Sequence, residues 1–212
     1  MTDRFASLHR PIGRHFRSRR LRRFARVFRL KPSTTVLDLG GSEYYWAWSP
    51  VLPRVTVVNL HRRDLRPERF PWVQADGRKL PFPDGSFDVV HCNSVLEHIV
   101  DERGRQQFAR EIARVGKAYW VQTPNRRFPV EAHTLTPGFH FLPRSLQARM
   151  ARNFTVWGWL ERPSVNEARG FVEHIHLLSA SDLQSLFPDA SIERERFLGL
   201  TKSLAAVGEQ GR

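Results

Sequence analysis

The sequence has very little cysteine and no long apolar run, and both absences limit what the chain can be. Cys92 is its one cysteine, so no internal disulfide can form, which fits a reducing compartment. No apolar run approaches the ~20 residues that a helix needs to span a bilayer, and the N-terminus lacks the apolar stretch of a secretory signal. We therefore expect a cytoplasmic protein without a transmembrane segment.

Two phosphate-binding motifs are also absent. The dinucleotide fingerprint G-x-G-x-x-G and the phosphate loop G-x-x-x-x-G-K-[ST] do not occur in the chain. Both motifs place small residues around a phosphate group. A dinucleotide and a nucleoside triphosphate are therefore disfavoured as ligands.

Acidic residues are scarce at the start of the chain, and this scarcity explains most of its charge. The net charge is +13, but residues 1–32 hold ten arginines and Lys31 against Asp3 alone, a charge of +10 that leaves +3 for the other 180 residues. Apolar residues recur there at near-helical spacing up to Pro32. We predict a basic amphipathic helix within 1–32 that either docks on the protein or attracts an anionic membrane surface, an acidic substrate or RNA.

The rest of the chain has the composition and the pattern of a soluble α/β domain. A hydrophobic content of 41% and a charged content of 26% over 212 residues suit one globular domain with a proper core. Short β-rich runs alternate with helical segments such as 102–115, and near-continuous apolar strands indicate a parallel sheet covered on both sides. We predict a doubly wound, mostly parallel sheet that ends in an antiparallel pair. The expected strands lie at 35–39, 55–60, 72–75, 87–92, 118–122, 192–197 and 202–207.

Within this main domain, 33–212, one long connection lacks clean periodicity. Residues 124–178 are rich in proline, phenylalanine, histidine and arginine. Long connections of this kind are usually lids or binding regions. We therefore expect a substrate lid over 124–178.

The stretch VLDLGGSEYYW, residues 36–46, points to a ligand. A strand that ends in an aspartate and two glycines lets a nucleotide-like ligand approach the backbone closely. The aromatic residues that follow would obstruct a phosphate. A ligand with a nucleoside and an amino acid but no phosphate fits better, and S-adenosylmethionine is such a ligand.

Three further motifs follow this turn in a fixed order. They are VTVVNL at 55–60, ADGRKLPFPDGSFDVVHCNSVLEHI at 75–99 and YWVQTPN at 119–125. In these motifs the chain resembles the class I S-adenosylmethionine-dependent methyltransferases, in particular the group known as type 11. The resemblance covers residues 33–207 and implies a Rossmann-like fold with S-adenosylmethionine as the cofactor.

The resemblance also assigns cofactor-binding residues. It places Asp38, Gly40, Gly41 and Ser42 at the methionine end, Asn59 and Leu60 at the ribose, Asp76, Gly77 and Arg78 around the adenine, and Asn93 and Ser94 beside the methionine and the sulfonium. Two positions depart from the family pattern. The turn loses the second and third glycines of G-x-G-x-G, and Asn59 replaces the acid that usually binds the ribose hydroxyls.

Methyl transfer from a sulfonium is an in-line displacement in which the cofactor brings the reactive carbon. The protein must hold the acceptor in line, and a hydroxyl acceptor also benefits from a general base. Three side chains of the lid, Glu131, His133 and His140, are the candidate bases. Ubiquinone-type O-methyltransferases carry E-x-x-E-H, associated with a divalent metal, where this chain has Ser94-x-x-Glu97-His98, so Glu97 and His98 are candidate metal ligands.

The lid composition favours a hydroxyl acceptor on a saccharide or another small molecule. Its aromatic residues can stack on a ring, and its arginines can bind polar oxygens. In type, the chain is similar to the sugar O-methyltransferases of methylmannose polysaccharide biosynthesis. Nucleic acid is disfavoured because the Asn-Pro-Pro-aromatic motif of amino-directed enzymes is absent. RNA, a phenol, a lipid, or a non-catalytic role in binding the cofactor remain as alternatives.

Overall fold

Seven strands form one sheet in this computed structural model, which describes residues 3–60 and 70–209. The strands are β1 (Thr35–Leu39), β2 (Arg54–Asn59), β3 (Trp72–Gln74), β4 (Val89–Asn93), β5 (Ala118–Pro124), β6 (Ser191–Phe197) and β7 (Leu200–Glu209). Their order across the sheet is β3-β2-β1-β4-β5-β7-β6. The first five run parallel, and β7 lies antiparallel to β5 and β6. The predicted α/β fold class is confirmed.

The strand order sets the position of a ligand site. The chain moves outward from β1 to β2 and β3 and then returns to the other side of β1 as β4. The connections after β1 and β4 therefore leave in opposite directions, which opens a crevice at the carboxyl ends of these two strands. The expected site residues after these strands converge there.

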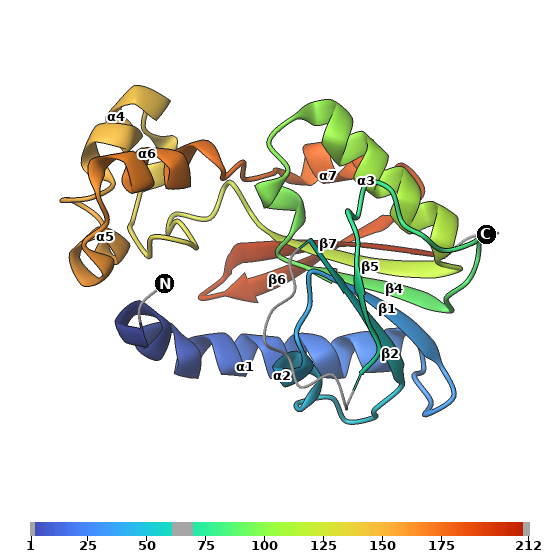
Figure 1. Cartoon of the computed structure of the whole chain (residues 1–212). Coiled ribbons are helices and arrows are strands. Elements are labelled where there is room, and N and C mark those ends of the chain that lie inside the picture. The colour runs from blue at the N-terminus through green and yellow to red at the C-terminus, as the bar shows by residue number, and fades with distance from the viewer. Residues whose placement is uncertain (1–2, 61–69, 210–212) are drawn as a thin grey trace.

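Helices cover both faces of the sheet (Figure 1). The helices are α1 (Asp3–Val27), α2 (Glu43–Trp46), α3 (Glu102–Val115), α4 (Arg144–Met150), α5 (Val156–Glu161), α6 (Val165–Glu173) and α7 (Ala180–Leu186), with 3-10 turns η1 (Leu96–His98) and η2 (Phe139–Phe141). On one face, α3 and α7 close a core that includes Ile112 and Leu183, both fully buried. On the other face lie α1 and the short α2.

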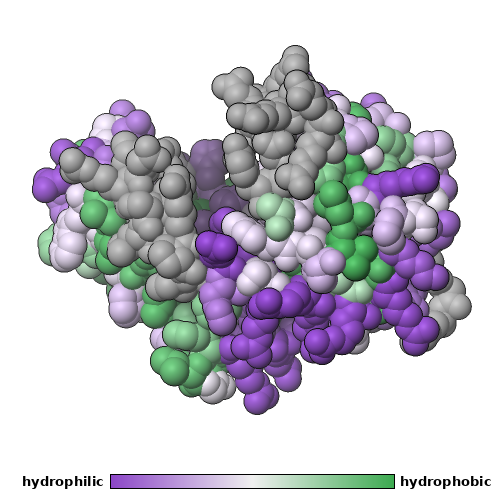
Figure 2. All heavy atoms as spheres, turned by 90° about the horizontal axis from the view of Figure 1, so that it is seen from below, coloured by the Kyte–Doolittle hydropathy of each residue, from purple (hydrophilic) through white to green (hydrophobic). Residues whose placement is uncertain are grey.

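The basic helix α1 is part of the main core. Its apolar residues Leu21 and Phe24 are fully buried against strand residues such as Val57 and Trp120. Arg19, Arg22 and Arg26 are exposed on the opposite side of the helix, and hydrophilic residues cover much of the face that carries α1 (Figure 2). Within 1–32 the structure has the helix α1, and this helix packs on the sheet.

The predicted lid contains a small helical cap. It carries η2, α4, α5 and α6, which pack around a core of their own that includes Phe139, Trp157 and Val172. Side chains begin two of these helices: Thr155 accepts from the backbone of Gly158, and Ser164 forms a capping box with Glu167. Figure 1 shows the cap beyond the carboxyl end of β5, beside the N-terminal part of α1.

None of the helices in the described part of the chain has the length and apolarity that crossing a bilayer requires.

Candidate active site

The turn after β1 folds back over Asp38. This aspartate is 1% exposed, and its two carboxylate oxygens accept hydrogen bonds from Trp46 Nε1 and His91 Nδ1, each at 2.8 Å. A Cβ atom on Gly41 would fall 1.7 Å from Asp38 Oδ2, and Gly40 has a φ of 70°. Only glycine permits this close approach and this left-handed backbone. The predicted contact of Asp38 with the cofactor ammonium stays a prediction, because the carboxylate also has this structural role.

Two aromatic residues of the turn, Tyr45 and Trp46, point into the core beneath it. Tyr45 and Trp46 are buried against α1, and the Trp46 ring meets Phe24 with a centroid distance of 6.1 Å. The helix α2 that carries them is only four residues long. The backbone of Gly40, Gly41 and Ser42 is therefore left at the edge of the sheet.

The other predicted cofactor residues lie along the same edge. Asn59 Nδ2 donates to the carbonyl of Gly41 at 2.9 Å, which ties the end of β2 to the turn. Leu60, which follows, is 57% exposed. After β3, the carboxylate of Asp76 accepts from the guanidinium and the backbone N–H of Arg78, and these hydrogen bonds hold its pKa below the usual range.

Gly77 and Ser94 each lie close to a neighbouring element at this edge of the sheet. A Cβ atom on Gly77 would fall 2.4 Å from the Phe108 ring, so the loop after β3 lies directly on α3. Ser94 adopts a φ of 56° after β4, and its hydroxyl lies 3.2 Å from Gln122 Oε1.

Arg20 of α1 reaches into this edge, which sequence reasoning missed. Its Nη1 donates to Asn93 Oδ1 and, at 2.8 Å, to Gln122 Oε1, while its Nε pairs with Glu195 at 3.3 Å. The arginine therefore holds Asn93, a residue that the resemblance places beside the methionine end of the cofactor. No signal in the sequence marks Arg20, because it stands within a run of arginines.

Four of the predicted catalytic and metal-binding residues come together beyond β4. Glu97 and His98 lie on η1, whereas Glu131 and His133 come from the segment between β5 and the cap. Possible ligand atoms of Glu97, His98 and His133 lie within 4.8 Å of one another. The candidate bases and the candidate metal ligands thus form one cluster, which we call the Glu97 cluster and define by these four residues.

Glu131 orients His133. Its carboxylate accepts from His133 Nδ1 at 2.8 Å and from the backbone N–H groups of His133 and Thr134. Burial acts against the ionised carboxylate, but these hydrogen bonds lower the pKa of Glu131 overall. Burial likewise opposes the charged imidazole of His133, and the hydrogen bond with Glu131 raises its pKa above the usual value. The Nε2 atom of His133 faces Glu97.

Glu97 is the most enclosed member of the cluster. Its side chain is 0% exposed, and burial raises the pKa of its carboxyl. Its Oε2 accepts from Thr123 Oγ1 at 3.0 Å, while its Oε1 has no hydrogen-bond partner among the described residues and lies 3.9 Å from His133 Nε2. Partial desolvation of the imidazole and the neighbouring His133 lower the pKa of His98 to about 4, although part of the residue remains exposed.

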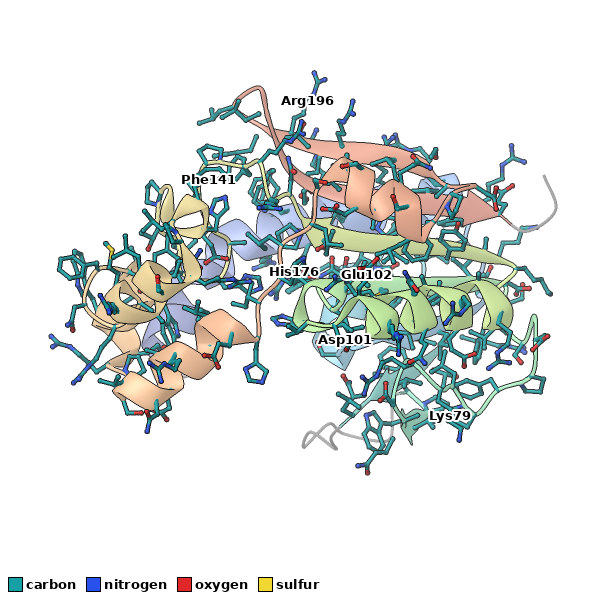
Figure 3. The ribbon with its side chains drawn as sticks, turned by 90° about the horizontal axis from the view of Figure 1, so that it is seen from above. Lys79, Asp101, Glu102, Phe141, His176 and Arg196 are labelled. Atoms are coloured by element: carbon teal, nitrogen blue, oxygen red, sulfur yellow. The ribbon has the colours of Figure 1, made fainter. Side chains whose placement is uncertain are left out.

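His140, the third predicted base, lies in a different place. Its Nε2 is 2.9 Å from the carbonyl of Arg126. It lines a cavity of about 400 Å³ in the cap, together with residues such as Phe139, Phe171 and Glu131. Glu131, a member of the Glu97 cluster, therefore also lines the cavity. Figure 3 shows His176, another lining residue, on the segment that joins the cap to the sheet, and its backbone N–H donates to the Glu97 carbonyl at 2.7 Å.

Comparisons with known proteins bear on the domain and its fold. Residues 20–118 match the family model of a methyltransferase domain. This match covers the strands and turns from the end of α1 to the start of β5. No curated protein matches the sequence.

Solved structures share the fold at low identity. A SAM-dependent methyltransferase from Archaeoglobus fulgidus has a TM-score of 0.57 at 14% identity and covers 93% of this chain and 94% of its own. The PH0226 protein from Pyrococcus horikoshii OT3 has a TM-score of 0.56 at 19% identity, with 92% and 90% covered. The N-methyltransferase NodS from Bradyrhizobium japonicum WM9 has a TM-score of 0.52 at 14% identity, with 93% and 94% covered.

The residues at the edge of the sheet fit S-adenosylmethionine. Asp76 offers a carboxylate for an amino group of the base, and Asn59 lies at the end of the neighbouring strand. Arg20 and Asn93 place a cation and an amide at the ends of β4 and β5, where an amino-acid end needs charged and polar partners. The cofactor would supply the electrophilic methyl group.

Proposed function

We propose that this methyltransferase transfers a methyl group to a hydroxyl of a saccharide or another small molecule. In this reaction the carbon–sulfur bond of the sulfonium breaks and a carbon–oxygen bond forms. The products are a methyl ether, S-adenosylhomocysteine and the proton of the hydroxyl. The protein therefore has to position the acceptor and help the proton to leave.

The Glu97 cluster is the observation that carries this proposal. A hydroxyl barely ionises at neutral pH, whereas an amine or a phenolate needs little help. The cluster combines two carboxylates and two imidazoles, and two of its members, Glu97 and His98, follow Asn93 and Ser94 shortly after the end of β4. We assign the loss of the acceptor's proton to this cluster, which contains Glu131 and His133 of the three predicted bases.

The cavity in the cap supports a small polar acceptor. Its walls combine the aromatic rings of Phe139 and Phe171 with the polar side chains of Arg126 and His140. Aromatic faces suit the apolar side of a sugar ring, and guanidinium and imidazole groups suit its oxygens. A cavity of about 400 Å³ is within the usual size range of small-molecule sites.

The arginines of α1 support a contact with an anionic surface as an additional property. Arg19, Arg22 and Arg26 are exposed on the face opposite the buried Phe24. The cytoplasmic location remains an expectation that rests on the single cysteine.

A transfer assay with methyl-labelled cofactor tests the proposal. Saccharides, phenols, anionic lipid vesicles and RNA are offered separately, and we expect label in a saccharide or another small hydroxyl compound. His133→Ala should lower the rate by about 10²- to 10⁴-fold, the usual contribution of proton transfer, whereas His15→Ala on the exposed side of α1 should not. Label in RNA or lipid alone would contradict the proposed acceptor. No label, together with a melting temperature raised by S-adenosylhomocysteine, would indicate a non-catalytic binding protein.

A further inference from the structure

The Glu97 cluster has the ligand set and the arrangement of a transition-metal site. Two imidazoles and one carboxylate, from His98, His133 and Glu97, have possible ligand atoms within 4.8 Å of one another. Two His and one Glu form a known set for catalytic zinc, which leaves a further coordination position for a substrate. Calcium and magnesium prefer oxygen ligands, so two imidazoles favour a transition ion.

The unpaired oxygen of Glu97 indicates that a cation belongs between the side chains of Glu97 and His133. Buried carboxylate oxygens normally accept a hydrogen bond. Glu97 Oε2 does so from Thr123, but Glu97 Oε1 is buried with no hydrogen-bond partner among the described residues. It faces His133 Nε2 at 3.9 Å, which is too long for a hydrogen bond. Two ligands of a tetrahedral ion lie roughly 3.4 Å apart when each bond is about 2.1 Å, so a cation fits between these atoms after a small side-chain shift.

Glu131 completes the arrangement as a positioning residue. Metal-bound histidines almost always donate their second ring N–H to a carboxylate, a carbonyl or water, which fixes the tautomer. The 2.8 Å contact of His133 Nδ1 with Glu131 places the proton on Nδ1 and leaves the Nε2 lone pair directed at Glu97. The carboxylate of Glu131 is fixed in turn by backbone N–H groups of His133 and Thr134.

We infer that Glu97, His98 and His133 bind a divalent transition-metal ion such as Zn²⁺, with Glu131 orienting His133. Three protein ligands leave a position for the acceptor hydroxyl, and an ion bound there lowers the pKa of that hydroxyl. This catalytic consequence rests on the proposed function, whereas ion binding does not. The ion would be the means by which the cluster helps the proton to leave.

Metal binding by the full chain without a histidine tag tests the inference. The protein is treated with a chelator, dialysed, and titrated with Co²⁺ or Zn²⁺ alone. Bound metal is measured by equilibrium dialysis, and Co²⁺ is also followed by its visible absorption. We expect about one equivalent of ion and cobalt bands of a site with few ligands.

Four variants make the result specific. Glu97→Gln and His98→Ala should each weaken binding by at least 10-fold, and His98 is exposed enough for its loss to leave the fold intact. Glu131→Gln should weaken binding by about 10- to 100-fold without abolishing it, as is typical of residues behind a ligand. His15→Ala removes an exposed imidazole elsewhere and should bind as the wild type does.

The outcomes separate this inference from the proposed function. Wild-type protein that binds no ion, or binds it equally in Glu97→Gln and His98→Ala, would overturn the metal site even if methyl transfer proceeds. Protein that binds the ion at the cluster but methylates no hydroxyl compound would overturn the proposed function and leave the metal site standing.

Discussion

Replacing Phe24 by alanine is the sharpest test of whether α1 belongs to the core. Phe24 is 0% exposed, and its ring lies 5.0–6.1 Å by centroid distance from the rings of Phe28, Trp46, His91 and Trp120. Phe→Ala in a packed core costs about 3–5 kcal/mol because transfer and cavity terms add. We therefore expect the free energy of unfolding to fall by that amount.

Urea denaturation measures this loss directly. With an m-value of about 2 kcal/mol/M, the midpoint should fall by about 2 M. Tryptophan fluorescence reports the transition, since Trp46 and Trp120 lie next to the altered side chain. Arg22→Ala, an exposed change on the same helix, should stay within about 0.5 kcal/mol. A loss below about 1 kcal/mol for Phe24→Ala would refute the packing of α1 on the sheet.

Three other changes have defined outcomes. Arg20→Ala removes the charged partner of Asn93, so calorimetry should show S-adenosylhomocysteine binding weakened about 10- to 100-fold. The same variant should bind methylthioadenosine, which lacks the amino-acid end, as the wild type does. The surface variant Arg23→Ala should bind S-adenosylhomocysteine without loss. Asp76→Ala should weaken S-adenosylhomocysteine by about 1.5–3 kcal/mol, and an unchanged Kd would remove Asp76 from the adenine site. Burial lowers the pKa of Lys202 to about 8 from 10.5, so the unfolded chain binds more protons in this window and the free energy of unfolding should rise from pH 8 to 10.5. Lys202→Met should abolish that rise in denaturation measured across this range.

The strands were predictable because their apolar residues are nearly continuous. Parallel strands buried on both faces need such runs, and the expected first strand, 35–39, coincides with β1. The fourth was placed at 87–92 but spans Val89–Asn93. Phe87 is apolar because it is buried, yet it makes only an isolated bridge with Gly116. A run of buried apolar residues therefore predicts where a strand lies better than it predicts the first and last residues of that strand.

The cap helices could not be read from periodicity. They are 6 to 9 residues long, too short for a hydrophobic repeat to stand out. The capping box of Ser179 and Asp182 at the start of α7 is different, because it is a local pattern of side chains that a sequence can show. Contacts between distant segments leave no such local mark.

The Glu97 cluster shows that functional contacts between distant segments are equally hard to predict from the sequence. The sequence indicates Glu97 and His98 as candidate metal ligands, and Glu131 and His133 as candidate bases. Their meeting depends on how the segment after β5 returns over η1, and the sequence does not encode that path in any short pattern. The 2.8 Å contact between Glu131 and His133 became visible only with the fold.

The aromatic residues after Gly41 now have a physical explanation. A turn that bound phosphate would need small residues there, but Trp46 turns beneath the sheet and donates to Asp38, while Tyr45 lies against His91 with a ring centroid distance of 5.1 Å. These rings fill the space between the sheet and α1. The departure from the family's glycine pattern therefore belongs to the core on the α1 side. It leaves the backbone of the turn at the edge of the sheet, where a cofactor without phosphate can approach it.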